Sequence, residues 1–268
     1  MTQYPFTTAK ISFVPAGIRE PTATYHGDTG EAVRNYEPEM REVQIVNGRL
    51  QQDRYTLDQN GFELVHQPTQ LGPVTDDADP TIKSHYYPEV TEILKQKTGA
   101  RDVLIFDHTI RITGNANGRL PVQSAHNDYT ETSAPKRVQD LLGAQEAQRW
   151  LSGRVAQVNL WRPLVGPVTA LPLALLDSLT LGPVDLRPSA LIFKDRTGQI
   201  YHVSHSTGQR WTYFPNMSTE EAILIKGYDS DTSGRARFTP HTAFVDPSTP
   251  DGSATRHSIE VRAFLRFD

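Results

Sequence analysis

Three side chains of metal-binding type stand at a spacing that allows them to share one site. His126 and Asp128 are separated by a single residue, and His241 follows far downstream. On a β-strand, residues i and i+2 point to the same face, so the His126 imidazole and the Asp128 carboxylate can face one ion. A histidine from a distant strand would complete a 2-His-1-carboxylate triad, which leaves coordination positions open and suits non-haem Fe(II). We therefore predict a metal site at His126, Asp128 and His241.

Arg256 and Ser258 form a second pair at the same i, i+2 spacing. A guanidinium offers a planar fork of donors and the hydroxyl adds one more, so the pair can clamp a carboxylate. Turn residues fill the segment 246–253 between His241 and Arg256. If the flanking strands form a hairpin, Arg256 lies beside His241. We therefore expect a co-substrate that carries a carboxylate near the metal.

Further segments of the chain resemble a known family, and they lie at residues 106–111, 159–163, 210–215, 228–230, 240–244 and 258–262. With the triad and the Arg256–Ser258 pair, they are similar to the Fe(II)/2-oxoglutarate-dependent dioxygenase superfamily and, within it, to the CmcJ/NvfI (AsaB-like) hydroxylase/desaturase family. His257 departs from that pattern, because an acidic residue is expected there. It stands between the two clamp residues and should face away from them.

The resemblance implies an activity and its cofactors. Fe(II) would bind His126, Asp128 and His241, and Arg256 and Ser258 would hold the distal carboxylate of the co-substrate 2-oxoglutarate. With O2, the enzyme would hydroxylate or desaturate a small molecule of secondary metabolism and decarboxylate 2-oxoglutarate to succinate.

Other polar and aromatic residues are candidates for the same site. Asn159 is a candidate for holding 2-oxoglutarate. Candidates for substrate binding are Arg111, Trp161, Arg162, Tyr213 and Arg262. Each also has a structural interpretation, since the arginines could form ion pairs, Arg262 with Glu260 or a neighbouring strand, and the aromatic residues could belong to the core. Among the other histidines, His108 is either a core residue or a neighbour of the site, whereas His26, His66, His85, His202, His205 and His257 carry no partner pattern and are expected to be surface, capping or ordinary strand residues.

The elements that must position these residues are mostly strands. We predict helices at 88–98, which Gly99 would end, and at 133–152. Predicted strands lie at 103–112, 155–162, 189–194, 199–205, 210–214, 221–227, 238–245 and 256–267, whereas 171–176 fits a short helix or an apolar loop. In the last strand an apolar set at odd positions alternates with a mostly polar set at even positions. The predicted fold is mainly β, a double-stranded β-helix (jelly-roll, cupin-like) with helices packed on one sheet.

Length and composition limit which cellular compartment and which classes of binding partner we expect. The 268 residues suit one domain (1–268), in which 1–100 supply strands and a helix that cover a jelly-roll core at 101–268. A net charge of −4 gives no reason to expect nucleic acid or an anionic membrane as a partner. The absence of cysteine excludes disulfides and cysteine-ligated zinc or iron–sulfur sites. The N-terminus does not read as a secretory signal, and no apolar stretch reaches the ~20 residues that span a bilayer. We expect a cytoplasmic enzyme, a monomer or homodimer, that acts on a small molecule.

Two other classes remain open. A non-redox cupin-like metal enzyme, an isomerase or hydrolase, would need the triad but not the Arg256–Ser258 clamp. A non-catalytic jelly-roll binding protein would need neither, and buried metal ligands without a metal would be costly to keep.

Overall fold

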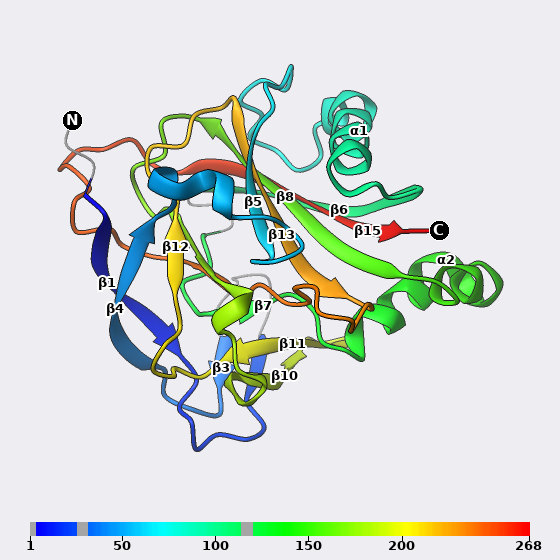
Figure 1. Cartoon of the computed structure of the whole chain (residues 1–268), viewed down its shortest axis with the longest axis horizontal. Coiled ribbons are helices and arrows are strands. Elements are labelled where there is room, and N and C mark those ends of the chain that lie inside the picture. The colour runs from blue at the N-terminus through cyan, green and yellow to red at the C-terminus, as the bar shows by residue number, and fades with distance from the viewer. Residues whose placement is uncertain (1–3, 26–31, 114–119) are drawn as a thin grey trace.

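Residues 4–25, 32–113 and 120–268, which the structure describes, form two β-sheets that pack against each other (Figure 1). The structure is a computed structural model. Helices α1 (Tyr87–Thr98) and α2 (Ser133–Leu151) lie on the side of the smaller sheet. His26 lies outside the described residues.

The strands are β1 (Phe6–Phe13), β2 (Thr22–Tyr25), β3 (Ala32–Arg34), β4 (Glu39–Asn47), β5 (Phe62–His66), β6 (Asp102–Ile112), β7 (His126–Asn127), β8 (Val155–Val165), β9 (Leu173–Leu176), β10 (Leu186–Ile192), β11 (Thr197–Val203), β12 (Trp211–Tyr213), β13 (Glu221–Asp229), β14 (His241–Ala243) and β15 (His257–Arg266). Short helical turns lie at Gly48–Arg54, Ile82–Tyr86, Ser178–Thr180 and Pro183–Asp185. The small sheet has the strand order β5-β13-β8-β15-β6, and the large sheet has the order β1-β4-β12-β9-β14-β7-β11-β10-β2-β3.

The strand order is that of a double-stranded β-helix. Along the chain, β6, β8, β13 and β15 of the small sheet alternate with β7, with β9 to β12 and with β14 of the large sheet. The two sets form facing sheets, β6-β15-β8-β13 and β7-β14-β9-β12. This arrangement confirms the predicted fold class.

The last strand confirms the predicted division of its two faces. Ile259, Val261 and Leu265 of β15 are fully buried and pack with Val90 and Leu94 of α1 in one core cluster. The even positions from 256 to 262 point to the other face, between the two sheets. Helix α1 begins with a proline in its first turn and ends at Gly99, whose φ of 71° suits glycine.

The large sheet curls at its β1 end. Ser12 at the end of β1 forms a bridge with Ser124, and the Ala125 amide donates to the Ser12 carbonyl at 2.9 Å. The apolar residues inside this curl form a second core, with Ile11, Phe13, Ile45, Leu176, Trp211, Tyr213 and Phe244 among them. The first 100 residues thus contribute strands to both sheets, and their role as a separate cover of a jelly-roll core stays a prediction.

Three local expectations were wrong or incomplete. Residues 173–176 form strand β9, and all four are buried, so no alternation identified the strand. β14 and β15 do not form a hairpin, because β14 pairs with β7 and β9 whereas β15 pairs with β6 and β8. The helix predicted at 133–152 exists but is kinked at Gly143, where φ is 73° and ψ is 172°. None of the described helices is long and apolar enough to cross a membrane.

Candidate metal centre

The three predicted metal ligands meet between the two sheets. His126 and His241 are directly opposite each other on the paired strands β7 and β14, and their ring centroids are 4.7 Å apart. Asp128 follows β7 and places Oδ1 3.6 Å from His126 Nε2. One ligand atom from each of the three residues lies within 4.8 Å of the other two. Among the described residues, this is the group whose geometry can hold a metal ion.

Both imidazoles are held in the tautomer that a metal requires. His126 Nδ1 lies 2.7 Å from the carbonyl of Ser124, and His241 Nδ1 lies 3.1 Å from the carbonyl of Thr239. Because a carbonyl oxygen only accepts, each Nδ1 carries the proton and each Nε2 keeps a lone pair for the metal. Burial, together with the neighbouring His241, lowers the pKa of His126 to about 4. His126 is therefore a neutral ligand at neutral pH.

Two side chains fix the carboxylate of Asp128. Its Oδ2 accepts from Asn159 Nδ2 at 2.7 Å and from Arg262 Nε at 3.4 Å, which leaves Oδ1 on the side of His126. Burial raises the pKa of Asp128, but Arg262, the two histidines and Asn159 outweigh it, so the net pKa is lowered. Asp128 is therefore an ionised ligand with a set orientation.

A wider polar network supports these contacts. Asn159 Nδ2 also donates to Glu260 Oε1 at 2.7 Å, and its Oδ1 accepts from Gln157 Nε2. Arg262 donates to Glu260 Oε2 at 2.8 Å and to Asp107 Oδ2 at 3.2 Å. Half-buried Asp128 and buried Glu260 share one guanidinium, so this part of the site has an excess of negative charge, which favours a divalent cation.

Gln157 and Glu260 were not identified from the sequence. Their signal was weak: Gln157 lies two residues before Asn159 on β8, and Glu260 belongs to the polar face of β15. Asn159 and Arg262 were identified as candidates, but their contacts are with Asp128 and its supporting network.

Arg256 is buried without an acidic partner. Its Nε donates to Ser258 Oγ at 3.1 Å, its Nη1 donates to the carbonyl of Leu171 at 2.9 Å, and its guanidinium lies 5.0 Å from the centre of a Trp161 ring. No carboxylate of the described residues lies within ion-pairing distance of it. Burial and the neighbouring Arg111 lower its pKa to about 9, although Glu260 acts in the opposite direction. A buried cation in this state is a site for an anion.

Arg111 and Trp161 lie on the same inner face of the small sheet as Arg256. Arg111 on β6 lies opposite Ser258 on β15, and its side chain donates to the carbonyl of Leu120 at 2.7 Å. Trp161 is 2% exposed, and its Nε1 has no acceptor among the described residues. Both residues can therefore meet a ligand held by Arg256.

The structure does not bring Arg162 and Tyr213 to the site. Arg162 points to the outer face of the small sheet, where it stacks 5.4 Å from Tyr86 and pairs with Glu89 at 3.5 Å. Tyr213 points into the core inside the curl of the large sheet, where its ring lies 5.4 Å from Phe244. Arg162 is one strand position away from Trp161, which faces the site, and this offset turns its side chain to the opposite face.

Three other histidines have distinct surroundings. His108 is on the outer face, between the Tyr87 hydroxyl at 2.7 Å and the Asp77 carbonyl at 2.8 Å, so it is a core residue away from the metal. His257 faces away from the clamp, as predicted, with Nε2 2.8 Å from the Val74 carbonyl. His202, expected to be an ordinary strand residue, is buried directly opposite His126 on β11, and its Nδ1 has no partner among the described residues.

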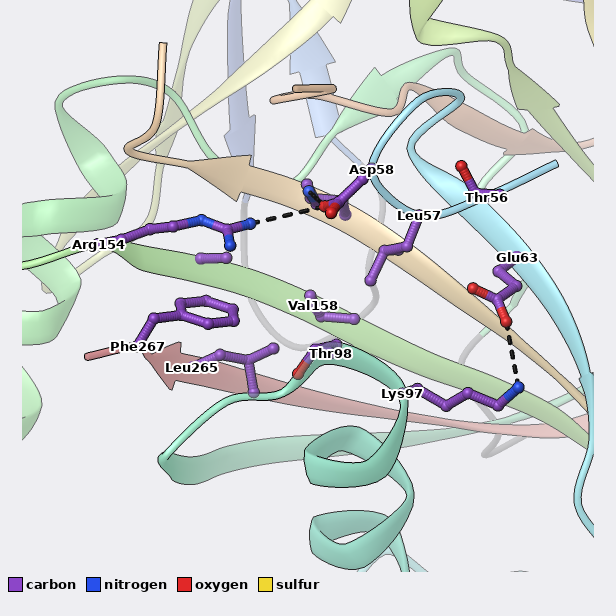
Figure 2. A pocket seen from close by; sticks show the side chains of 12 residues that line it. Thr56, Leu57, Asp58, Glu63, Lys97, Thr98, Arg154, Val158, Leu265 and Phe267 are labelled. Atoms are coloured by element: carbon purple, nitrogen blue, oxygen red, sulfur yellow. Dashed lines mark hydrogen bonds and ion pairs between the residues drawn. The ribbon is translucent and has the colours of Figure 1, made fainter. Parts of the chain in front are cut away.

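A hollow of about 180 Å³ lies on the outer face of the small sheet, away from the triad (Figure 2). Val158 and Leu265 line its floor. Its charged groups are paired with one another, Lys97 with Glu63 at 3.2 Å and Lys226 with Asp58 at 2.8 Å. The hollow therefore lacks the unpaired charge that distinguishes the region between the sheets.

Known proteins are similar to this chain over most of its length. Residues 13–266 match a family model described as "Oxidoreductase/YMDC permease-like domain". The Fe(II)/2-oxoglutarate-dependent dioxygenase nvfI of Aspergillus novofumigatus is 29% identical over 243 residues, which cover 88% of this chain and 87% of that protein. The hydroxylase/desaturase efuI of Hormonema carpetanum is 30% identical over 267 residues, which cover 90% of this chain and 88% of that protein. A solved structure of the iron and alpha-ketoglutarate-dependent endoperoxidase NvfI superimposes with a TM-score of 0.89 over 98% of each chain, at 26% identity.

Proposed function

Because the chain belongs to the family of Fe(II)/2-oxoglutarate-dependent dioxygenases and hydroxylase/desaturases, we propose that it hydroxylates or desaturates a small molecule of secondary-metabolite type. The observation that carries the proposal is the buried Arg256, which has no acidic partner among residues 4–25, 32–113 and 120–268 and lies on the same face as the network around the Asp128 carboxylate. A dicarboxylic co-substrate that lies between a metal and the Arg256 guanidinium accounts for both the buried arginine and the network that holds Asp128.

The residues present fit the two groups that the family requires. His126, Asp128 and His241 would hold Fe(II), since both imidazoles present Nε2 and the carboxylate is ionised. With 2-oxoglutarate and O2, Fe(II) supplies the oxidation of an unactivated C–H bond, and 2-oxoglutarate leaves as succinate and CO2. The distal carboxylate of 2-oxoglutarate would pair with Arg256 and accept a hydrogen bond from the hydroxyl of Ser258.

The other residues around the centre either hold the Asp128 carboxylate in position or contact the substrate. Asn159 and Arg262 hold Asp128 Oδ2 and so keep Oδ1 directed at the metal position. This contact supports a positioning role for Asn159 in place of a direct contact with 2-oxoglutarate. Arg111 and Trp161, which face the same space, are the substrate-side residues. We propose that the enzyme works in the cytoplasm as a monomer or homodimer, where a reducing environment keeps iron ferrous.

Formation of an endoperoxide is a second candidate outcome. The protein in the solved NvfI structures, to which this chain is similar over nearly its whole length, is named an iron and alpha-ketoglutarate-dependent endoperoxidase. Product mass separates the outcomes: a hydroxylase adds one oxygen atom, a desaturase removes a pair of hydrogen atoms, and an endoperoxidase adds both atoms of O2.

An anaerobic titration tests the proposed function. Fe(II) and 2-oxoglutarate added to the apo protein should give a weak visible charge-transfer band, and His126→Ala, Asp128→Ala and His241→Ala should each lose it while they remain folded. On exposure to O2 the wild type should form succinate slowly, and faster with its substrate. If the iron-loaded wild type forms no succinate above the no-enzyme control with any of a broad panel of amino-acid, terpenoid and polyketide compounds, a non-redox metal enzyme or a binding protein is the better interpretation.

A further inference from the structure

Strand β13 carries a bulge beside the metal centre. Lys226 pairs with Val158 and Tyr228 pairs with Gln157, so Gly227 is an extra residue between two paired positions. Gly227 is buried and does not have a positive φ, so its backbone conformation is open to any residue. Space is the reason for glycine here. A methyl group on its Cα would overlap Gln157 Oε1, lie 3.3 Å from Gln157 Cδ and lie 4.0 Å from Asp128 Cβ.

The side chain that fills this space leads to a metal ligand. Gln157 is fully buried, and its Nε2 donates to Asn159 Oδ1. Because Gln157 donates to Asn159 Oδ1, the Asn159 amide is oriented with Nδ2 toward Asp128. Asn159 Nδ2 donates to Asp128 Oδ2 at 2.7 Å. Gln157 Oε1 is buried against Gly227 without a hydrogen-bond partner among the described residues, so a shift of this side chain acts on its one described hydrogen bond, the bond to Asn159. A side chain at position 227 would therefore displace Gln157 and, through Asn159, the Asp128 carboxylate.

The carbonyl of Gly227 leads to the other ligands. Asn127, the residue between His126 and Asp128, donates from Nδ2 to the Gly227 carbonyl at 2.7 Å. The Oδ1 of the same amide accepts from the Thr239 amide at 2.9 Å. Thr239 in turn accepts from His241 Nδ1 through its carbonyl. The bulge is thus connected by hydrogen bonds to the segments that carry all three ligands.

We propose that Gly227 is a positioning residue for the metal centre, which sets Asp128 through Gln157 and Asn159 and sets the His126–Asp128 segment through Asn127. The inference rests on the proposed function only in taking the centre to bind a divalent metal. Supporting side chains of a metal ligand typically change metal affinity by about 10–100-fold when they are altered. Gly227 touches no ligand atom and acts through the contacts of two amide side chains.

The first experiment measures metal affinity of the apo protein, without any turnover. Gly227→Ala should bind Fe(II), titrated anaerobically, about 10–100-fold more weakly than the wild type, and its Co(II) complex should show an altered visible absorption spectrum. Gly198→Ala on β11 is the matched control, because a methyl group there would meet Leu191 Cβ at 3.8 Å and the Leu191 carbonyl oxygen at 4.0 Å, which are ordinary contacts. Wild-type Fe(II) affinity in Gly227→Ala would overturn the proposal, as would a lowered apo melting temperature with the metal affinity unchanged.

A double-mutant cycle tests the route through Gln157. Gln157→Ala removes the atom that the new methyl group would meet and also the bond that orients Asn159. If Gly227 acts through Gln157, the double variant Gly227→Ala/Gln157→Ala should bind Fe(II) no more weakly than the weaker single variant, because both changes break the same connection. Losses that multiply in the double variant would overturn the route. A wild type that binds no metal would overturn the positioning role, whereas a wild type that binds Fe(II) but forms no succinate would contradict only the proposed function.

Discussion

Two arginines near the end of the chain have opposite surroundings: Arg262 is a half-buried residue of strand β15, and Arg256 is a buried residue directly before that strand. Arg262 contacts Asp128, Glu260 and Asp107 at 2.8–3.4 Å, and these carboxylates raise its pKa despite its burial. Arg256, six residues earlier, contacts a hydroxyl, a carbonyl and an aromatic ring, and no carboxylate of the described residues pairs with it; burial lowers its pKa to about 9. Arg262 is thus neutralised by carboxylates, whereas Arg256 is a buried cation that no described carboxylate neutralises.

The contrast separates a supporting residue from a binding residue. The protein itself neutralises Arg262, so a ligand has little to gain from it, and its role is to fix Asp128. Arg256 has no acidic partner in the part of the chain that the structure describes, so an anionic ligand would gain a desolvated ion pair there. Two arginines that the sequence presents as equivalent candidates are therefore distinguished by what surrounds them.

The largest expected effect of breaking this contrast is on stability, in Arg262→Met. The change leaves Asp128 and Glu260 buried near each other without their cation, and it should lower the free energy of unfolding of the apo protein by about 3–5 kcal/mol. Urea denaturation of the apo protein measures this loss. Fe(II) should restore part of it, because a bound dication replaces the missing positive charge. An apo protein as stable as the wild type would show that Arg262 is not the counter-ion of this network.

Arg256→Met should have the opposite pattern. Binding of 2-oxoglutarate should weaken by roughly 2–5 kcal/mol, since one partner of a buried charged pair is removed. Apo stability should stay level or rise, because an unpaired buried charge has been replaced by a side chain of similar length. Arg256→Lys should recover binding only in part, since a point charge replaces a planar fork. Unchanged 2-oxoglutarate dependence in Arg256→Met would remove the assigned carboxylate site.

A smaller effect separates positioning from binding at Asn159. Asn159→Ala should weaken Fe(II) binding by about 10–100-fold, because Asp128 Oδ2 loses its shortest hydrogen bond. At saturating Fe(II), the affinity for 2-oxoglutarate should stay close to that of the wild type. A selective loss of 2-oxoglutarate affinity in this variant would instead place Asn159 in contact with the co-substrate.

The smallest effect is in acid. The unfolded chain takes up a proton at His126 near the ordinary pKa of 6.5, whereas the folded protein does so only at about 4. The free energy of unfolding of the apo protein should therefore fall as the pH is lowered across that window. One pH unit below that ordinary pKa the wild type should have lost about 1.4 kcal/mol of stability through this group, and His126→Asn should lack this loss. The contribution of the Asp128–Arg262 pair should persist through this window and be lost only below the ordinary carboxyl pKa of 3.8, since the pKa of Asp128 is lowered.

The sequence identifies those features that depend on short spacing. His126 and Asp128 two residues apart, Arg256 and Ser258 two residues apart, and the alternation of β15 each define a shared face without knowledge of the fold. Together with the series of short predicted strands and the family resemblance, these patterns predicted the fold class, and the structure places the predicted triad together.

The sequence does not identify features that depend on which sheet a strand joins. The turn residues at 246–253 signal a reversal, but they do not reveal that the chain crosses from the large sheet to the small one. The outward direction of Arg162 depends on the register of β8 against β15 and β13, and the helix that receives it comes from distant residues. The role of Asn159 likewise depends on Asp128, 31 residues away, and on Glu260, 101 residues away.

The position of β15 has a consequence for the order in which the site is made. Within the small sheet, β15 is the last strand that the ribosome synthesises, yet it lies between β8 and β6. Until it emerges, β6 has no neighbour in that sheet, and neither of the two arginines has left the ribosome. A nascent chain that already carries His126, Asp128 and His241 therefore lacks the counter-charge of Asp128 and the carboxylate clamp. Iron and 2-oxoglutarate should be acquired only after translation has passed β15, by a chain whose two sheets have already closed.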